Sequence, residues 1–171
     1  MNPRASLINW ALLMSLVMLW GTSFMFISIA IDSIDPLTVV FGRVSIGALL
    51  LTIMVYAKGR RLPFDRRSWM AFLIMGAMGN VLPFFLITWG QQSIDSGMAG
   101  MIMAVMPLIT MLLAHYFILG ETLNRYKIFG FMLGLGGITM LLGPVFEGGG
   151  PAAWGGIAVF FAAFSYAVNT I

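Results

Sequence analysis

Long apolar runs alternate with short polar segments along the whole chain. The run at 97–119 holds 23 residues without Asp, Glu, Lys or Arg. At a helical rise of about 1.5 Å per residue, a run of this length crosses a hydrocarbon core of about 30 Å. The pattern predicts six membrane-spanning helices: Leu7–Ile31, Leu37–Ala57, Trp69–Gln91, Gly97–Leu119, Ile128–Leu142 and Ala152–Ile171.

The polar segment 120–127 connects the fourth and fifth runs. It is too short to carry the chain back across a bilayer, so these two runs are expected to form an antiparallel hairpin. Glu121 stands close in sequence to Arg125 and Lys127. We expect Glu121 to clamp this hairpin at the membrane interface.

The composition agrees with an all-α integral membrane protein. Hydrophobic residues make up 60% and charged residues 9% of the chain, against about 45–50% and about 25% in soluble domains. The chain has no cysteine, and His115 is its one histidine. Because the sequence also shows no nucleophile with a base partner, no phosphate loop and no metal-ligand spacing, it predicts neither an enzyme nor a cofactor or metal site.

The charges predict an orientation. Under the six-helix threading, one side of the membrane receives eight of the nine Lys and Arg residues: Arg4, Lys58, Arg60, Arg61, Arg66, Arg67, Arg125 and Lys127. The opposite side receives Asp32, Asp35, Asp95 and Glu147. The positive-inside rule therefore places the amino terminus in the cytoplasm, for a protein of the inner (plasma) membrane. This topology explains the basic residues, so the expected partners are the lipid bilayer and a small solute, not a nucleic acid.

The resemblance to a known family rests on the order and spacing of small, proline and polar residues and their neighbours along the chain: Leu19–Phe24, Pro36, Arg43, Gly76, Pro83, Phe84, Gln91, Pro107, Leu108, Gly120, Glu121, Gly130, Gly134 and Gly137. This series resembles the EamA family of the drug/metabolite transporter superfamily. The resemblance implies a fold of two inverted five-helix repeats that moves small metabolites, often outward.

The resemblance also implies a division of this chain. Residues 1–148 would form a first five-helix repeat, and 149–171 the first helix of a second, inverted and truncated repeat. A weak internal match, Leu19–Ser23 with Phe164–Asn169, is consistent with such a repeat. We therefore expect the missing second repeat, or a partner chain, to complete the transporter.

One face of the third run is a candidate wall of a substrate pathway. The face carries Asn80, Phe84, Thr88 and Gln91 at helical spacing. Asn80 and Gln91 would leave polar groups unsatisfied against lipid, so they are expected to face a wet cavity or to form a dry hydrogen bond between helices. Pro83 is expected to free the carbonyl of Gly79 and to kink the helix.

Two other runs supply further candidates for the pathway. Trp20, Ser23 and Phe24 form a stripe in the first run, where they either stack on a solute or simply pack. In the fourth run Pro107 leaves the carbonyl of Met103 without its helical donor. That carbonyl could contact a solute, or Pro107 could do no more than bend the helix.

Arg43 lies about 10 Å into the second run, where a charge is costly unless it has a partner. It is expected either to bind an anionic solute or to link helices through Asp32, Asp35, Asp95, Gln91 or Gln92. In the fifth run Gly130, Gly134 and Gly137 form a small-residue ridge that predicts close packing between helices.

The sequence thus predicts a membrane permease, or its amino-terminal half, that moves small metabolites or drugs through a cavity lined by helices 1, 3 and 4. The alternative is a non-transporting membrane scaffold, a partner-dependent subunit or a non-functional fragment.

Overall fold

A computed structural model describes the backbone of residues 3–171 and the side chains of 7–140, 142, 143 and 147–171, and this described chain is helical, without strands. Its elements, in chain order, are α1 (Pro3–Ile31), α2 (Pro36–Ala57), α3 (Arg66–Gly76), the π-helix η1 (Ala77–Val81), α4 (Leu82–Gly90), α5 (Ser96–Met103), α6 (Val105–Phe117), α7 (Arg125–Glu147) and α8 (Gly150–Thr170).

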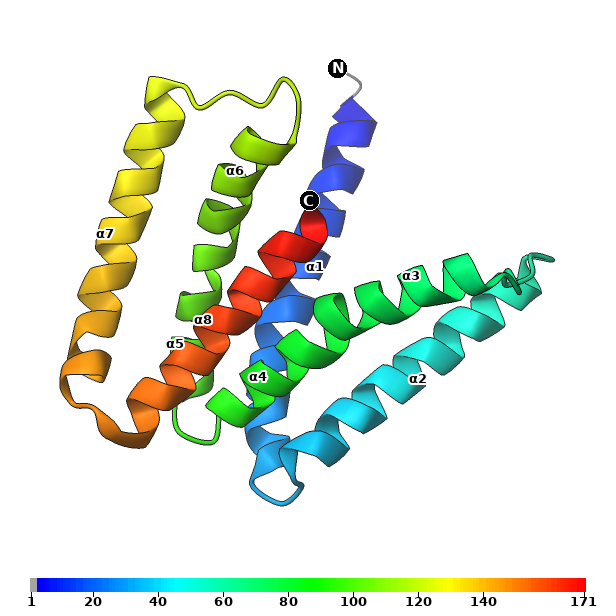
Figure 1. Ribbon diagram of the computed structural model, residues 1–171, viewed down its shortest axis with the longest axis horizontal. Helices are drawn as coiled ribbons and strands as arrows, with labels where there is room; N and C mark the ends of the chain where they lie inside the picture. Colours follow the sequence, from blue (N-terminus) through cyan, green and yellow to red (C-terminus); the bar gives the residue numbers. More distant parts are fainter. Residues whose placement is uncertain (1–2) are drawn as a thin grey trace.

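Five segments of the described chain are long and apolar enough to cross a membrane: Leu7–Ile31, Pro36–Ala57, Arg66–Gly90, Ser96–Phe117 and Gly150–Thr170. The chain is therefore a multi-pass membrane protein, as predicted. The remaining predicted span, Ile128–Leu142, lies within the 23-residue helix α7, which runs beside α6 (Figure 1).

Aspartates begin three of the spans. Asp35, Asp65 and Asp95 each accept a hydrogen bond from an amide in the first turn of the helix that follows. This capping satisfies amides that have no partner inside the helix. Hydrogen bonds from the Thr38 side chain and the Leu37 amide hold the pKa of Asp35 below its usual value. Two of these carboxylates, Asp35 and Asp95, were candidate partners for Arg43, and neither forms an ion pair with it among the described side chains.

The third span changes its helical register halfway. In η1 the amide of Leu82 donates to the carbonyl of Ala77, five residues back, and Pro83 has no N–H to donate. The carbonyl of Met78 therefore receives neither amide. The Ser165 hydroxyl of α8 donates to it at 2.6 Å. The sequence pointed to Gly79 as the freed carbonyl, whereas the π-turn places the bond from another helix one residue earlier.

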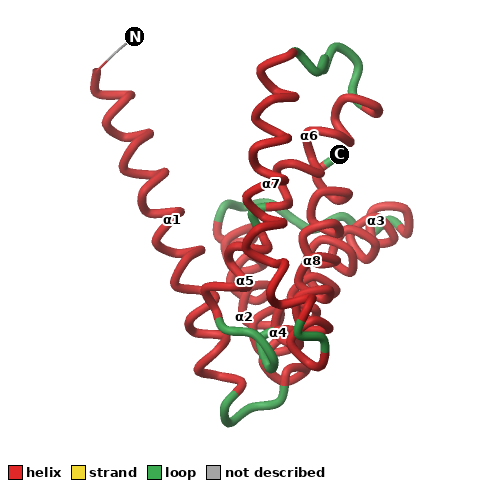
Figure 2. Tube along the Cα trace, turned by 90° about the vertical axis from the view of Figure 1, so that its left-hand side faces the viewer, coloured by secondary structure: helices red, strands yellow, loops and turns green. Residues whose placement is uncertain are grey.

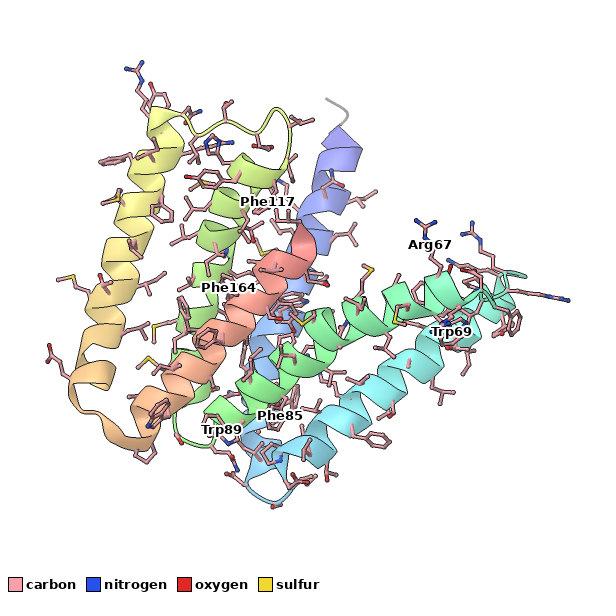
Figure 3. The ribbon with its side chains drawn as sticks, in the orientation of Figure 1. Arg67, Trp69, Phe85, Trp89, Phe117 and Phe164 are labelled. Atoms are coloured by element: carbon pink, nitrogen blue, oxygen red, sulfur yellow. The ribbon has the colours of Figure 1, made fainter. Side chains whose placement is uncertain are left out.

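The ends of this span lie far apart in Figure 3. Arg67 and Trp69 lie at the α3 end, and Trp89 lies near the end of α4. The Trp69 indole N–H donates to the carbonyl of Pro63 in the preceding loop at 2.8 Å. Tryptophans near both ends of an apolar span are typical of residues at the two membrane interfaces.

The fourth span is interrupted as well. α5 ends at Met103 and α6 begins at Val105, with Ala104 between them. The Ala104 amide donates to the carbonyl of Met101, a tighter bond than the α-helical one. This irregular turn lies just before Pro107, as expected for a proline inside a membrane helix.

Helix α8 occupies the centre of the bundle. It crosses α4 in antiparallel fashion and also packs against α5 and α6 (Figure 1). Its buried positions are mostly small: Gly155, Gly156, Ala158, Val159, Ala162, Ala163, Ser165 and Ala167. A Cβ on Gly90 would lie 2.7 Å from the Gly155 carbonyl oxygen, so only glycines permit this approach.

The helices are packed at one end of the bundle and diverge at the other. Buried residues such as Ile27, Ile87 and Ile102 gather toward the Asp35 and Asp95 connections. By contrast, residues 7–20 of α1 are all exposed. Figure 2 shows α1 separating from the other helices toward its amino end, and Figure 1 shows α2 and α3 leading away from α6 and α7.

Candidate functional site

A cavity of about 250 Å³ lies where the first three spans and α8 meet. Its walls come from α1, α2, η1, α4, α5 and α8. The lining residues are Leu19, Trp20, Ser23, Phe24, Ile27, Arg43, Asn80, Phe84, Ile87, Met103 and Tyr166. Most of this lining is aromatic or aliphatic, with a few polar groups among them, as in small-molecule sites generally.

The cavity brings together six of the nine side chains predicted for a substrate pathway. Trp20, Ser23 and Phe24 reach it from α1, Asn80 from η1, Phe84 from α4 and Met103 from α5. Asn80 and Phe84 line the same cavity, although they belong to different helical segments.

The other three predicted residues do not line the cavity. The Thr88 hydroxyl is buried and donates to the carbonyl of Phe84. The Gln91 amide nitrogen donates to the carbonyl of Phe24 at 3.0 Å, which links α4 to α1. Its Oε1 atom is buried and has no hydrogen-bond partner in the part of the chain that the structure describes. Pro107 is exposed on α6.

Arg43 reaches the cavity from α2. Its guanidinium carbon lies 4.1 Å from the centroid of the Phe84 ring, within the range of a cation–π contact. Phe84 in turn meets Tyr166 edge to face, with the ring centroids 6.3 Å apart and the planes at 67°. Three helices, α2, α4 and α8, therefore join in one stack at the cavity wall.

Tyr166 of α8 lines the cavity and was not among the predicted site residues. The signal was present, because a tyrosine follows the small residues of that run and places a hydroxyl at membrane depth. The sequence does not predict that α8 crosses α4 next to Phe84, because this crossing depends on how the two helices pack.

Glu121, the predicted hairpin clamp, lies in the loop between α6 and α7 and pairs with Lys127. The Lys127 ammonium lies 3.0 Å from the Glu121 carboxylate, and both side chains are partly exposed. The Nδ1 atom of His115 lies 2.9 Å from the Glu121 carbonyl oxygen, which accepts the hydrogen bond. Exposed ion pairs contribute little to stability, so we expect this one to add little to the stability of the hairpin between α6 and α7.

The glycine ridge of α7 packs at one position. A Cβ on Gly134 would lie 3.2 Å from the Leu108 side chain of α6. The same test finds no atom within 4 Å of Gly130 or Gly137. The α6–α7 contact therefore centres on Gly134, and the other two glycines lie on open faces of α7.

In the part of the chain that the structure describes, no three His, Asp or Glu side chains lie close enough together to hold a metal ion. The cavity lining carries one cation, Arg43, and no carboxylate. What this arrangement offers chemically is recognition of a small solute by ring faces, a guanidinium and the polar groups of Asn80, Ser23 and Tyr166.

Residues 8–143 match the sequence model of the EamA-like transporter family. An uncharacterised transporter of Bacillus subtilis, YoaV, is 26% identical over 160 residues, which cover 93% of this chain and 54% of the relative. An uncharacterised inner membrane transporter of Escherichia coli K12, YedA, is 28% identical over 174 residues, which cover 100% of this chain and 55% of the relative.

A third relative, from Streptantibioticus cattleyicolor, is named a probable terminal-alkyne amino-acid exporter. It is 28% identical over 132 residues, which cover 77% of this chain and 43% of the relative. The chain thus spans about half the length of the curated relatives it matches. No solved structure matches it.

Proposed function

Because the chain belongs to the EamA-like transporter family, we propose that it supplies the solute-binding helices of a permease for small metabolites or drugs. The solute occupies the cavity between α1, α4 and α5, next to Arg43 and Tyr166. The observation that carries this proposal is the convergence of polar side chains on that cavity. The polar groups of Asn80 and Ser23 need hydrogen-bond partners at membrane depth. Water or a solute in the cavity would supply these partners.

The complete transport unit, in this proposal, contains a second set of helices. Residues 1–148 act as one repeat, and 149–171 as the first helix of the second, inverted repeat. Two observations support a larger unit. The curated relatives are nearly twice as long as the matched region, and the diverging parts of α1, α2 and α3 expose their surfaces broadly. The second set comes from a longer form of this chain or from a partner chain.

Solute flux in reconstituted vesicles tests the proposal. We expect saturable uptake with a ten-helix form in which a second repeat follows α8, and much slower uptake with the 171-residue chain alone. Flux from the chain alone at a comparable rate would show that a second repeat is not required. Absence of flux from both forms, across organic acids, amines and neutral solutes, would favour a scaffold.

Asn80→Leu in the ten-helix form is expected to lower the initial transport rate by about tenfold, as for the loss of one polar contact to solute. The protein level should change by less than about twofold, because Asn80 is exposed to the cavity side and not part of the buried core. Thr110→Val is the matched control, since the Thr110 hydroxyl bonds within its own helix. Parallel losses of rate and protein would assign Asn80 to folding instead.

The orientation is a second prediction of the proposal, and it rests on the distribution of Lys and Arg. Reporters fused after Arg61 or Asn124 are expected to read cytoplasmic, and reporters after Asp95 or Gly149 external. A cytoplasmic reading after Asp95 or Gly149 would refute the six-span threading.

A further inference from the structure

We infer that the cavity selects solutes with a carboxylate or a chemically similar anionic group, and that Arg43 is the side chain that binds this group. The inference rests on the proposed function, because it assigns a substrate class to the same cavity. The inference adds a preference for one sign of charge: the cavity should bind small amphipathic anions more tightly than neutral or cationic solutes of the same shape.

Among the described side chains, Arg43 has no carboxylate partner. Across the described side chains the one ion pair is that of Lys127 with Glu121, at the far end of the bundle. Asp35 and Asp95 each accept a hydrogen bond from an amide of the helix that follows them, and neither forms an ion pair with Arg43 in the described chain. A guanidinium at membrane depth is costly when it is unpaired, so an anion that enters the cavity would relieve that cost.

Among the residues that the structure describes, an aromatic ring face, and no oxygen acceptor, meets the guanidinium of Arg43. The Phe84 ring face compensates part of the positive charge, yet it offers none of the oxygen lone pairs that a guanidinium fork binds best. Phe84 is itself held by the edge-to-face contact with Tyr166. The stack thus restrains the guanidinium at the cavity wall and leaves its N–H donors for a solute. A planar carboxylate can accept two of them at once.

The other residues that line the cavity carry no charge. No Asp or Glu lines the cavity, so nothing there would pair with a cationic solute. Trp20, Phe24 and Met103 provide aromatic and thioether surface for an apolar body. A volume of about 250 Å³ accommodates a small molecule. Together these features fit a small organic anion with one apolar or aromatic end.

The test is a binding series on the whole 171-residue chain in lipid nanodiscs, measured by calorimetry. The probes share one ring: phenylacetate, the neutral phenylacetamide and the cationic phenethylamine. We expect phenylacetate to bind about tenfold tighter than either of the others, because a charge-assisted bidentate pair is stronger than a neutral hydrogen bond. Equal affinity for phenylacetate and phenylacetamide, or no binding of phenylacetate, would overturn the inference without any variant.

Variants then locate the selecting group. Arg43→Gln should lower phenylacetate affinity to that of phenylacetamide, whose own affinity stays nearly unchanged. Arg43→Lys keeps the charge without the fork, and should keep the order of the probes with weaker phenylacetate binding. Arg66→Gln, the same change on α3 outside the cavity, is the control. A preference for phenylacetate that survives Arg43→Gln would contradict the assignment.

A fourth probe, L-phenylalanine, identifies the source of the carboxylate. Binding as tight as that of phenylacetate would point to α-amino acids, and weaker binding to plain organic acids. The binding series and the vesicle assay can refute the carboxylate site and the permease independently of each other. Carboxylate selectivity without flux in any form overturns the permease and keeps this site. Flux of neutral or cationic solutes without carboxylate preference keeps the permease and overturns this site.

Discussion

Replacing Gly90 by alanine is expected to destabilise the folded chain by about 1–3 kcal/mol, the usual cost of overpacking a tight contact. The new Cβ would lie 2.7 Å from the Gly155 carbonyl oxygen and 2.8 Å from a methyl group of Val159. A backbone carbonyl cannot rotate aside, so α4 and α8 would have to separate. Gly155→Ala should act in the same way, since its Cβ would lie 2.7 Å from the Gly90 carbonyl oxygen.

Gly76→Ala is the matched control for Gly90→Ala. It is the same change in the same membrane span, and no atom lies within 4 Å of the new Cβ. Alanine favours a helix over glycine by about 0.5–1 kcal/mol, so this control should be neutral or slightly stabilising. The measurement is the thermal unfolding midpoint in mild detergent. Equal midpoints for the two variants would show that α4 and α8 do not approach as closely as described.

The helices were predictable from the sequence, and their relative placement was not. Apolar length alone predicts where a chain can cross a bilayer, and Pro36 opens α2 at its first position, where its missing N–H is not needed. The faces of membrane helices are harder to read. Lipid is as apolar as a protein core, so hydrophobicity does not say which face meets a neighbour. The central position of α8 therefore came only from the structure, although its small residues were visible in the sequence.

Part of the candidate site could likewise be predicted from the sequence, and its helix–helix contacts could not. A polar residue at membrane depth must face protein or a cavity, and that requirement pointed to Asn80 and to the helix face that it shares with Phe84; both residues line one cavity. The requirement could not tell a cavity position from a dry contact, which is why Gln91 was included although it bonds to the Phe24 carbonyl. Arg43 was expected near carboxylates or amides. The ring of Phe84 meets it instead, a partner that no charge pattern could indicate.

Ser165→Ala is expected to cost about 1–3 kcal/mol of stability, the desolvation penalty of a buried acceptor left unpaired. The Met78 carbonyl receives the Ser165 hydroxyl because its two possible amide donors are lost, one to the π-turn and one to Pro83. Ser15→Ala is the control, since the Ser15 hydroxyl bonds to a carbonyl of its own helix on an exposed face. That change should stay within about 0.5 kcal/mol.

Restoring an amide at position 83 should rescue this loss. Pro83→Ala supplies an N–H five residues after Met78, in the register of η1, so it can donate to the same carbonyl. Ser165→Ala should then cost less in a Pro83→Ala background than in the native chain. A double-mutant cycle of unfolding free energies measures the difference, which we expect to exceed about 0.5 kcal/mol. Strict additivity would mean that Ser165 stabilises the chain by its packing alone, and that the register change in η1 leaves no carbonyl in need of a donor from α8.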